Sequence, residues 1–150
     1  MKALKIDQNS VRSINLKEAS NGGIDLADLQ SRVGGYIEPF NLLFENVTLY
    51  VNEEGMRMCE PNRLIVATQY MADNLRIEPL SPVTILYGNI IAVGRDPDTG
   101  DDRSLTKQEE QLVRGYFHEL AKPGSGVAAL SGASMFDWLL NIAKSYGLSE

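Results

Sequence analysis

Apolar and polar residues alternate along several short stretches of the chain, which is the pattern of half-buried β-strands. The clearest stretch is Val47 to Val51, where two valines and a leucine share one face and a threonine and a tyrosine share the other. Turn-forming residues follow from Asn52 to Gly55, and Met56 to Met58 would continue on a returning strand. The pattern therefore predicts a central β-hairpin with its tip at Asn52 to Gly55.

Other segments predict further strands. Residues 2–6 and 10–16 read as an opening strand and its hairpin partner. Tyr36 to Glu38 predicts a short strand that ends at Pro39, because proline cannot donate to a ladder of hydrogen bonds. The run Val83 to Val93, VTILYGNIIAV, fits one long strand with a bulge or two strands joined by a Gly-Asn turn. We favour the single bulged strand.

Helices are predicted where apolar residues recur at spacings of three and four. Leu26 to Val33 has this spacing, with Asp25 as its N-cap and Gly34 as its stop. Thr106 and Glu109 form a capping box that begins a second helix. The apolar residues expected on its inner face are Leu112, Val113, Tyr116, Phe117 and Leu120. Residues 64–73 fit both a buried strand and a helical face, and we favour the helix.

These elements predict an α+β fold, a mostly antiparallel sheet with helices packed against it, over residues 1–122. Small residues dominate the segment from Gly124 to Gly132, which predicts a flexible linker over residues 123–133. Residues 134–150 then predict a C-terminal helical extension that carries Trp138, the single tryptophan.

Composition narrows the choice of partner and compartment. The chain has 150 residues and a formal net charge of -6, so direct binding to DNA is not expected, whereas binding to basic proteins is permitted. Its single cysteine, Cys59, allows no internal disulfide and fits a reducing compartment. The N-terminus does not read as a signal peptide and no window reads as a membrane span. We therefore expect a cytoplasmic protein without membrane association.

The sequence carries no phosphate-binding loop, serine-hydrolase elbow or zinc-protease motif, so we expect neither an enzyme nor a cofactor. The acidic loop from Asp96 to Asp102 resembles a calcium loop only superficially. Lysine occupies the twelfth position, where a bidentate glutamate is needed, so we expect no metal. The pairs Glu53-Glu54 and Asp101-Asp102 leave acid-base catalysis as a minor alternative.

Polar residues beside predicted strand ends form the candidate binding site. Arginine forks recognise phosphates or carboxylates, asparagines read hydrogen-bonding edges, and loop glutamates offer carboxylates to a partner. The candidates, expected to share one surface, are Asn52, Glu53, Glu54, Asn62, Arg63, Asn89, Arg95 and Arg103.

The ordered motifs Gly34-Gly35-Tyr36-Ile37-Glu38, Asn52-Glu53-Glu54-Gly55, Pro61-Asn62-Arg63 and Tyr87 to Gly94 resemble those of domain-of-unknown-function family 3846. Its members are small proteins encoded by phages, plasmids and conjugative elements. The resemblance extends over about residues 1–117, and the chain departs from the family after Leu120. It implies no enzyme activity and no cofactor, and it implies a mobile-element setting, in which small acidic proteins often counter host defence.

We therefore expect a counter-defence protein that acts stoichiometrically, by sequestering a host immune factor or its nucleotide signal. An alternative is an acidic inhibitor, or DNA mimic, of a restriction enzyme or nuclease. A mimic needs a spaced stripe of carboxylates, whereas a nucleotide trap needs a concave pocket with arginines. Homo-oligomers are a further expectation, formed through Phe40 to Phe44 or through the C-terminal helix.

Overall fold

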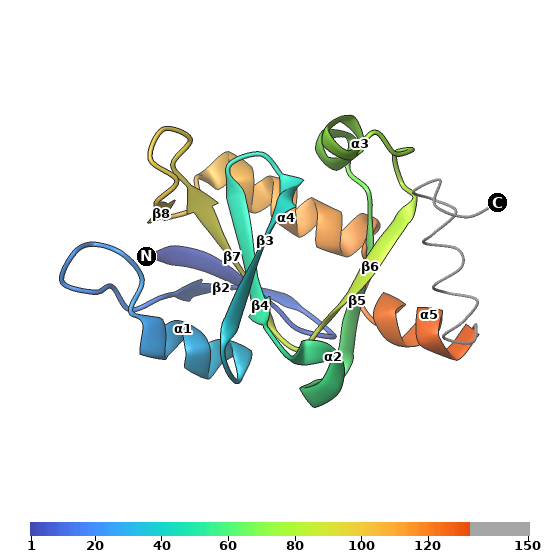
Figure 1. Ribbon diagram of the computed structural model, residues 1–150, viewed down its shortest axis with the longest axis horizontal. Helices are drawn as coiled ribbons and strands as arrows, with labels where there is room; N and C mark the ends of the chain where they lie inside the picture. The colour runs from blue at the N-terminus through green and yellow to red at the C-terminus, as the bar shows by residue number, and fades with distance from the viewer. Residues whose placement is uncertain (133–150) are drawn as a thin grey trace.

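A computed structural model describes residues 1–132 of the chain. Over these residues the chain forms two antiparallel sheets and five helices (Figure 1), which confirms the α+β class. In order, the elements are β1 (Lys2–Ile6), β2 (Val11–Asn15), α1 (Leu26–Val33), β3 (Ile37–Phe44), β4 (Val47–Asn52), α2 (Gly55–Met58), β5 (Pro61–Val66), α3 (Gln69–Leu75), β6 (Pro82–Tyr87), β7 (Ile90–Arg95), β8 (Asp102–Arg103), α4 (Lys107–Glu119) and α5 (Ser125–Gly132).

The larger sheet has the strand order β2-β1-β7-β4-β3, and β8 pairs with the end of β7. The predicted N-terminal hairpin is confirmed, because β1 and β2 pair antiparallel from Lys2 with Asn15 to Ile6 with Val11. Strand β7 lies at the centre, between β1 and β4. The sheet is therefore built from two hairpins that are joined by a strand from much later in the chain.

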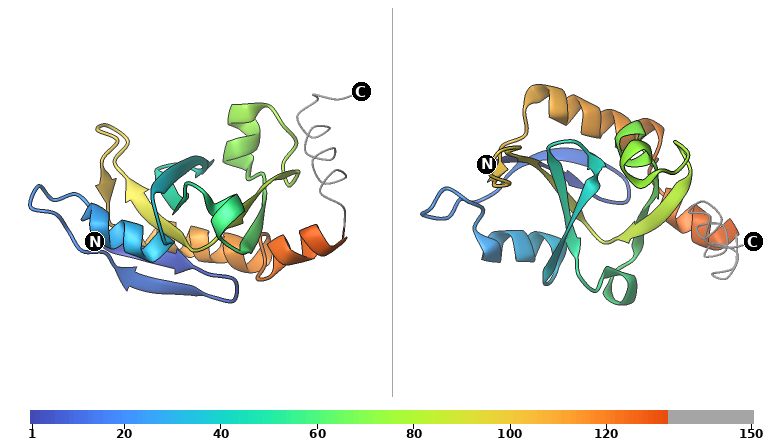
Figure 2. Two further views of the ribbon diagram at one scale, coloured as in Figure 1. Left: turned by 60° about the horizontal axis from the view of Figure 1, so that its bottom comes forward. Right: turned by 45° about the horizontal axis from the view of Figure 1, so that its top comes forward.

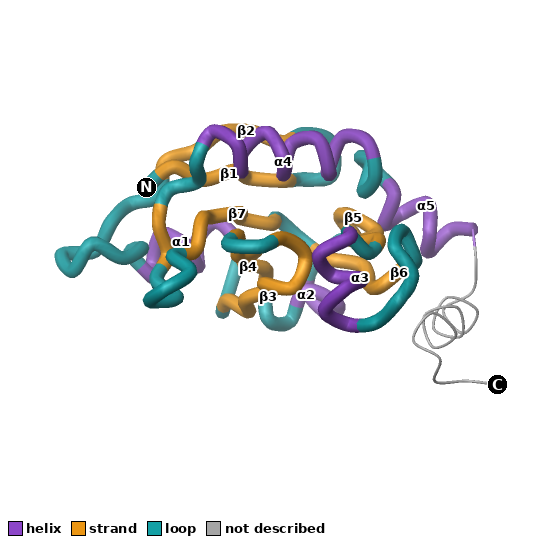
Figure 3. The backbone as a smooth tube through the Cα atoms, turned by 90° about the horizontal axis from the view of Figure 1, so that it is seen from above, coloured by secondary structure: helices purple, strands orange, loops and turns teal. Residues whose placement is uncertain are grey.

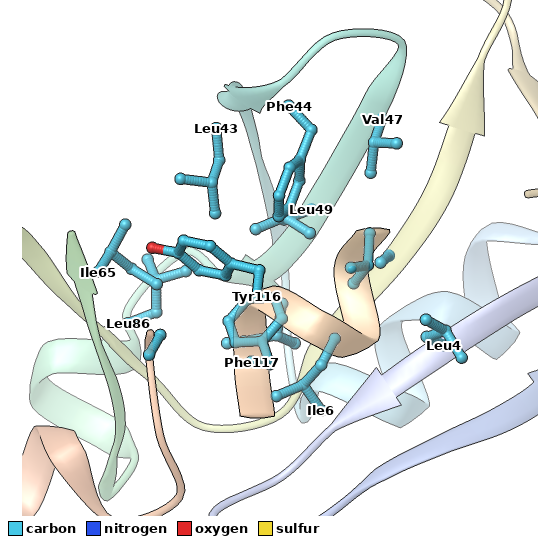
Figure 4. Packing of buried hydrophobic residues seen from close by; sticks show 14 of the residues in the cluster. Leu4, Ile6, Leu43, Phe44, Val47, Leu49, Ile65, Leu86, Tyr116 and Phe117 are labelled. Atoms are coloured by element: carbon cyan, nitrogen blue, oxygen red, sulfur yellow. The ribbon is translucent and has the colours of Figure 1, made fainter. Parts of the chain in front are cut away.

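Helices α1 and α4 cover opposite faces of this sheet (Figure 2). Along β7, Ile90 and Ala92 pack into the core beneath α4, whereas Ile91 and Val93 pack towards α1. The alternation predicted for Val47 to Val51 is confirmed in β4, whose valines and leucine lie in the core beneath α4. Figure 4 shows this core, in which the rings of the α4 aromatic residues meet the side chains of β3 and β4.

The two predicted helices with clear caps are confirmed. In α1, the Asp25 side chain accepts a hydrogen bond from the backbone N–H of Asp28, and Gly34 ends the helix with a positive φ of 84°. In α4, Thr106 and Glu109 form the reciprocal capping box. Both signals depend on contacts within four residues, so they are specified by local sequence.

The central hairpin was predicted in the wrong place. Strand β4 pairs with the preceding strand β3, and the chain reverses at Asn46, which has a φ of 59°. Gly55–Met58 is a short helix, α2, rather than a returning strand. Strand β3 also continues through Pro39, because β3 is an edge strand and proline is tolerated where no neighbour needs its N–H.

The smaller sheet pairs β5 with β6 and corrects two further predictions. Pro61–Val66 is a strand, and the helix favoured for residues 64–73 begins only at Gln69. The run Val83 to Val93 is not one bulged strand, because β6 and β7 belong to different sheets. Gly88 separates them with a φ of 72°, a conformation that carries the chain from one sheet to the other.

The segment predicted as a flexible linker forms helix α5, which packs against β5. A Cβ atom added to Gly126 would lie 3.1 Å from the backbone nitrogen of Arg63, so glycine lets the helix approach the strand closely. The small residues read as flexible thus serve packing. The predicted extension over residues 134–150 lies outside the described residues.

Candidate functional site

Two of the predicted site residues, Asn62 and Asn89, line the same polar pocket of about 400 Å³ beside the β1–β2 turn. The fully buried side-chain amide of Asn62 donates to the backbone oxygens of Ile6, at 2.9 Å, and Gly88, at 2.7 Å. Asn89 donates to the backbone oxygen of Arg32 at the end of α1. Both amide groups therefore connect elements of the fold, and Asn62 has no donor left for a ligand.

Arg63 is completely buried, and its guanidinium donates only to groups of the protein. One terminal nitrogen donates to the backbone oxygens of Phe117 and Ala121 at the end of α4, and the other donates to that of Asp7 at 2.8 Å. Its Nε atom donates to Asn62. Burial lowers the pKa of Arg63, an effect that the charge of Asp7 opposes. Arg63 thus ties β5 to α4 and to the β1–β2 turn.

Around Asn52, the predicted cluster divides into buried and exposed groups. The Asn52 amide is buried, donates to the backbone oxygen of Val33 and accepts from the backbone N–H of Glu54. Glu53 and Glu54 are exposed, and Glu54 pairs with Arg57 at 2.8 Å. The asparagine holds the end of β4 against α1, and the two carboxylates face water.

Arg95 and Arg103 lie at the opposite end of β7 from Asn89. Arg95 is six positions further along the chain than Asn89, or roughly 20 Å of strand. Arg103 makes two hydrogen bonds with the carboxylate of Glu109, at 2.7 Å and 2.9 Å. These bonds raise the pKa of Arg103 and lower that of Glu109. The expectation that all the predicted residues share one surface is therefore wrong.

Several groups that line the polar pocket beside the β1–β2 turn already have partners within the protein. Asp7 accepts from the backbone N–H groups of Asn9 and Ser10 and pairs with Arg12 at 3.2 Å. Burial acts to raise the pKa of Asp7, but these hydrogen bonds and the arginine charge lower it overall. The arrangement stabilises the turn, and it leaves the carboxylate ionised at neutral pH.

Of the paired carboxylates considered for catalysis, Asp102 is held by a structural partner. The hydroxyl of Tyr50 donates to both of its oxygens, at 2.9 Å and 2.8 Å. Burial raises the pKa of Asp102, while the hydrogen bond from Tyr50 opposes that rise. Burial also raises the pKa of Tyr50. This pair links β4 to β8 across the central strand.

A different surface, an apolar groove, was not predicted. The α3–α4 groove lies between the β3–β4 turn, α3 with the loop after it, and α4, and its volume is about 840 Å³. Figure 3 shows the backbone of α3 and α4. Leu43, Phe44 and Tyr116, all buried, lie at its base. Three leucines that line it are strongly exposed: Leu80 at 59%, Leu112 at 54% and Leu120 at 44%.

The charges of the α3–α4 groove have one sign. Of the described residues that line it, only Glu45 and Glu119 are charged, and neither forms an ion pair with another residue of the range 1–132. The predicted inner face of α4 had included Leu112 and Leu120, which face this groove rather than the core. Gly115 lies in the middle of α4, and a Cβ atom added to it would meet nothing within 4 Å among the described residues.

Metal centres and membrane-spanning helices are two other features to consider in residues 1–132. His, Cys, Asp and Glu side chains nowhere gather in threes that could hold a metal ion. None of the helices in that range has the length and apolar character needed to span a bilayer.

The fold and its surfaces define an α+β domain with two antiparallel sheets and an exposed apolar groove. The chain belongs to the family described as domain of unknown function DUF3846, whose family model matches residues 1–118. This match confirms the resemblance drawn from the sequence motifs. Neither the curated proteins nor the solved structures contain a match to this chain.

Proposed function

We propose that this protein is a counter-defence protein of a phage or another mobile genetic element. It acts in the host cytoplasm, without turnover, by binding a host defence protein and holding it in an inactive complex. The mobile-element setting rests on the family resemblance. The mode of action rests on the α3–α4 groove.

The observation that carries this proposal is the exposure of Leu80, Leu112 and Leu120 around one concave surface. Single exposed apolar residues are common on protein surfaces and need no explanation. Several of them lining one groove are typical of a protein-binding site, because water is released from the apolar surface when a partner covers it. The base of the groove is buried core, so the surface is preformed.

Two other modes of action receive less support from the geometry. A trap for a nucleotide signal would need arginines free to bind phosphate in a pocket, but Arg63 is buried and Arg103 is paired with Glu109. A DNA mimic would need a spaced stripe of free carboxylates. Asp28 and Glu110 pair with arginines of their own helices, whereas Glu53 and Asp98 are exposed and form no ion pair within residues 1–132. Capture of a protein partner therefore explains more of the surface.

The test is relief of defence in bacterial strains that each carry one defence system. We expect expression of the chain to restore phage plaque formation in at least one strain. We expect the variant Leu112→Gln to lose this effect and the variant Leu26→Gln to keep it. Leu26 is a matched control, because it is 55% exposed at the start of α1 and does not line the groove.

Two outcomes would contradict the proposal. One is relief that persists when the chain is far less abundant than the defence protein, since a stoichiometric inhibitor must match its target in number. The other is equal relief by Leu112→Gln and the wild type. Purified chain and target should also co-elute at a fixed molar ratio in size-exclusion chromatography.

A further inference from the structure

Helix α4 contains a glycine that the fold does not explain. Gly115 has no positive φ, and a Cβ atom added to it would meet nothing within 4 Å. Glycine in a helix interior lowers helix stability relative to alanine, because it loses more backbone freedom on folding. Neither backbone conformation nor packing within residues 1–132 requires glycine at this position.

Helix α5 shows what a helical glycine does elsewhere in this chain. A Cβ atom added to Gly126 would lie 3.1 Å to 3.3 Å from backbone atoms of Asn62 and Arg63 in β5. Glycine there allows a helix and a neighbouring backbone to approach closely. Gly115 offers α4 the same close approach, but it faces the α3–α4 groove, where no element of residues 1–132 lies against it.

The structure around the groove indicates which secondary structure a partner segment would have. The sides of the groove are formed by α3 and α4, and the edge strand β3 contributes to its base. Helix α3 packs against β3, and the backbone oxygen of Leu43 already accepts a hydrogen bond from the Thr68 hydroxyl, so this end of β3 offers little free edge to an extended segment. An α-helix satisfies its own backbone hydrogen bonds and can therefore lie on an apolar surface without losing any. The helix needs an apolar face, because Leu112 and Leu120 flank Gly115 along α4.

The charged residues at the rim of the groove favour a partner helix of positive charge. Glu45 and Glu119 are both acidic, and no lysine or arginine is among the described residues that line the groove. A partner with lysines or arginines beside its apolar face would meet these carboxylates favourably. A second copy of this chain, docked through the same face, would place acidic rim against acidic rim, which is unfavourable.

We infer that the α3–α4 groove receives an amphipathic α-helix of the partner protein, with basic residues flanking its apolar face. The helix lies against Gly115, its apolar side chains cover Leu80, Leu112 and Leu120, and its cations face Glu45 and Glu119. This inference rests on the proposed function for the existence of a protein partner. It adds the chemical class of the segment that is recognised.

The probe is a pair of synthetic, fluorescently labelled helical peptides of about 18 residues, or roughly 27 Å of helix. Both carry leucines at helical spacing, and they differ only in the flanking residues, which are lysines in one and glutamates in the other. Fluorescence anisotropy with the purified full chain should show the lysine peptide binding at least roughly tenfold more tightly. Added salt should weaken this preference, because it screens exposed charges.

Variants of the chain show whether the peptide binds in the groove or on another apolar surface. Gly115→Leu fills the open space and should weaken binding of the lysine peptide roughly tenfold or more. Leu112→Gln should weaken it as well, whereas the matched control Leu26→Gln should not. Changing both Glu45 and Glu119 to lysine should reverse the preference, so that the glutamate peptide binds more tightly. Thermal melting confirms that each variant is folded.

Several results would overturn the inference: equal binding of the two peptides, no binding of either up to about 1 mM, or unchanged binding by Gly115→Leu. A dimer of the chain that Leu112→Gln disrupts would also overturn it, because a second copy would then occupy the groove. If neither peptide binds but Leu112→Gln still abolishes counter-defence, the inference is contradicted and the proposed function is still supported. If the peptides bind as expected but the chain relieves no defence, the inference about the groove is supported and the proposed counter-defence function is contradicted.

Discussion

Replacement of Arg63 by methionine should remove a large part of the stability of this domain. Methionine retains an unbranched, apolar side chain but no hydrogen-bond donor. The guanidinium donates to two backbone oxygens at the end of α4 and to a third in the β1–β2 turn. It also lies over the ring of Phe117, with its central carbon 5.7 Å from the ring centroid. All of these contacts are lost together.

The magnitude follows from the oxygens left behind. The hydrogen bonds to the oxygens of Phe117, in α4, and of Ala121, just after it, are buried, and a buried acceptor without a partner costs about 1–3 kcal/mol. Water can reach the partly buried oxygen of Asp7, so its contribution is smaller. With the lost packing on Phe117, we expect about 4 kcal/mol in total. Domains of this kind have about 5–15 kcal/mol of stability, so the variant should be close to unfolding.

The measurement is urea unfolding of the full chain, followed by far-ultraviolet circular dichroism. Arg95→Met is the matched control, because the Arg95 side chain makes no hydrogen bond or ion pair with any other residue in the range 1–132. Its free energy of unfolding should change by less than about 0.5 kcal/mol. A loss below about 1 kcal/mol for Arg63→Met would refute the reasoning. It would mean that the freed oxygens find water or new donors.

Three other changes have expected outcomes in the same assay. Gly115→Ala should raise the free energy of unfolding by about 0.5–1 kcal/mol, whereas Gly126→Ala should lower it, because the new Cβ would crowd the backbone of β5. Tyr50→Phe should lower it by about 1–2 kcal/mol at neutral pH and by less in acid, where Asp102 is protonated and needs no donor. Glu109→Gln should cost about 1 kcal/mol at neutral pH.

The two carboxylates, Glu109 and Asp102, contribute to the pH dependence of stability with opposite signs. The pKa of Glu109 is lowered in the folded chain, so its contribution is present above its unfolded pKa of about 4.5 and is lost as the pH falls through the folded value. The pKa of Asp102 is raised, so the folded state binds more protons and stability falls as the pH rises from about 3.8 to the folded value. A Tyr50→Phe loss that does not shrink in acid, or a Glu109→Gln loss that persists below both pKa values, would contradict these assignments. A gain in stability from Gly126→Ala would contradict the packing argument.

The parts of the fold that local sequence specifies were predictable. The N-cap Asp25, the stop at Gly34 and the capping box of α4 all act over a few residues, and each is in its expected place. The division of Val83 to Val93 between two sheets was not predictable in this way. It depends on which strands lie beside β6 and β7, and those strands, β5 and β4, come from elsewhere in the chain.

The polar candidates show why residue type alone overestimates a binding site. Asn52, Asn62 and Arg63 were selected as polar groups at strand ends, where ligands often bind. Strand ends and helix ends also leave backbone oxygens without partners, and buried oxygens must be satisfied. In this chain the three side chains donate hydrogen bonds to such backbone oxygens, and they are buried as a result. Their partners come from distant segments, so spacing in the sequence could not reveal the role.

The pattern of apolar residues in helix α4 explains why the sequence did not predict the α3–α4 groove. Its apolar residues fit one inner face by periodicity, and Val113, Tyr116 and Phe117 are indeed buried. Leu112 lies at the edge of that buried stripe, Leu120 is the C-cap residue at which the helix ends, and both remain exposed. The periodicity of apolar residues indicates that a helix face packs against something. It does not distinguish packing against the same chain from packing against another protein. Gly115 is a local indication of packing against another protein, because it weakens the helix and a Cβ atom added to it would meet nothing within 4 Å among residues 1–132.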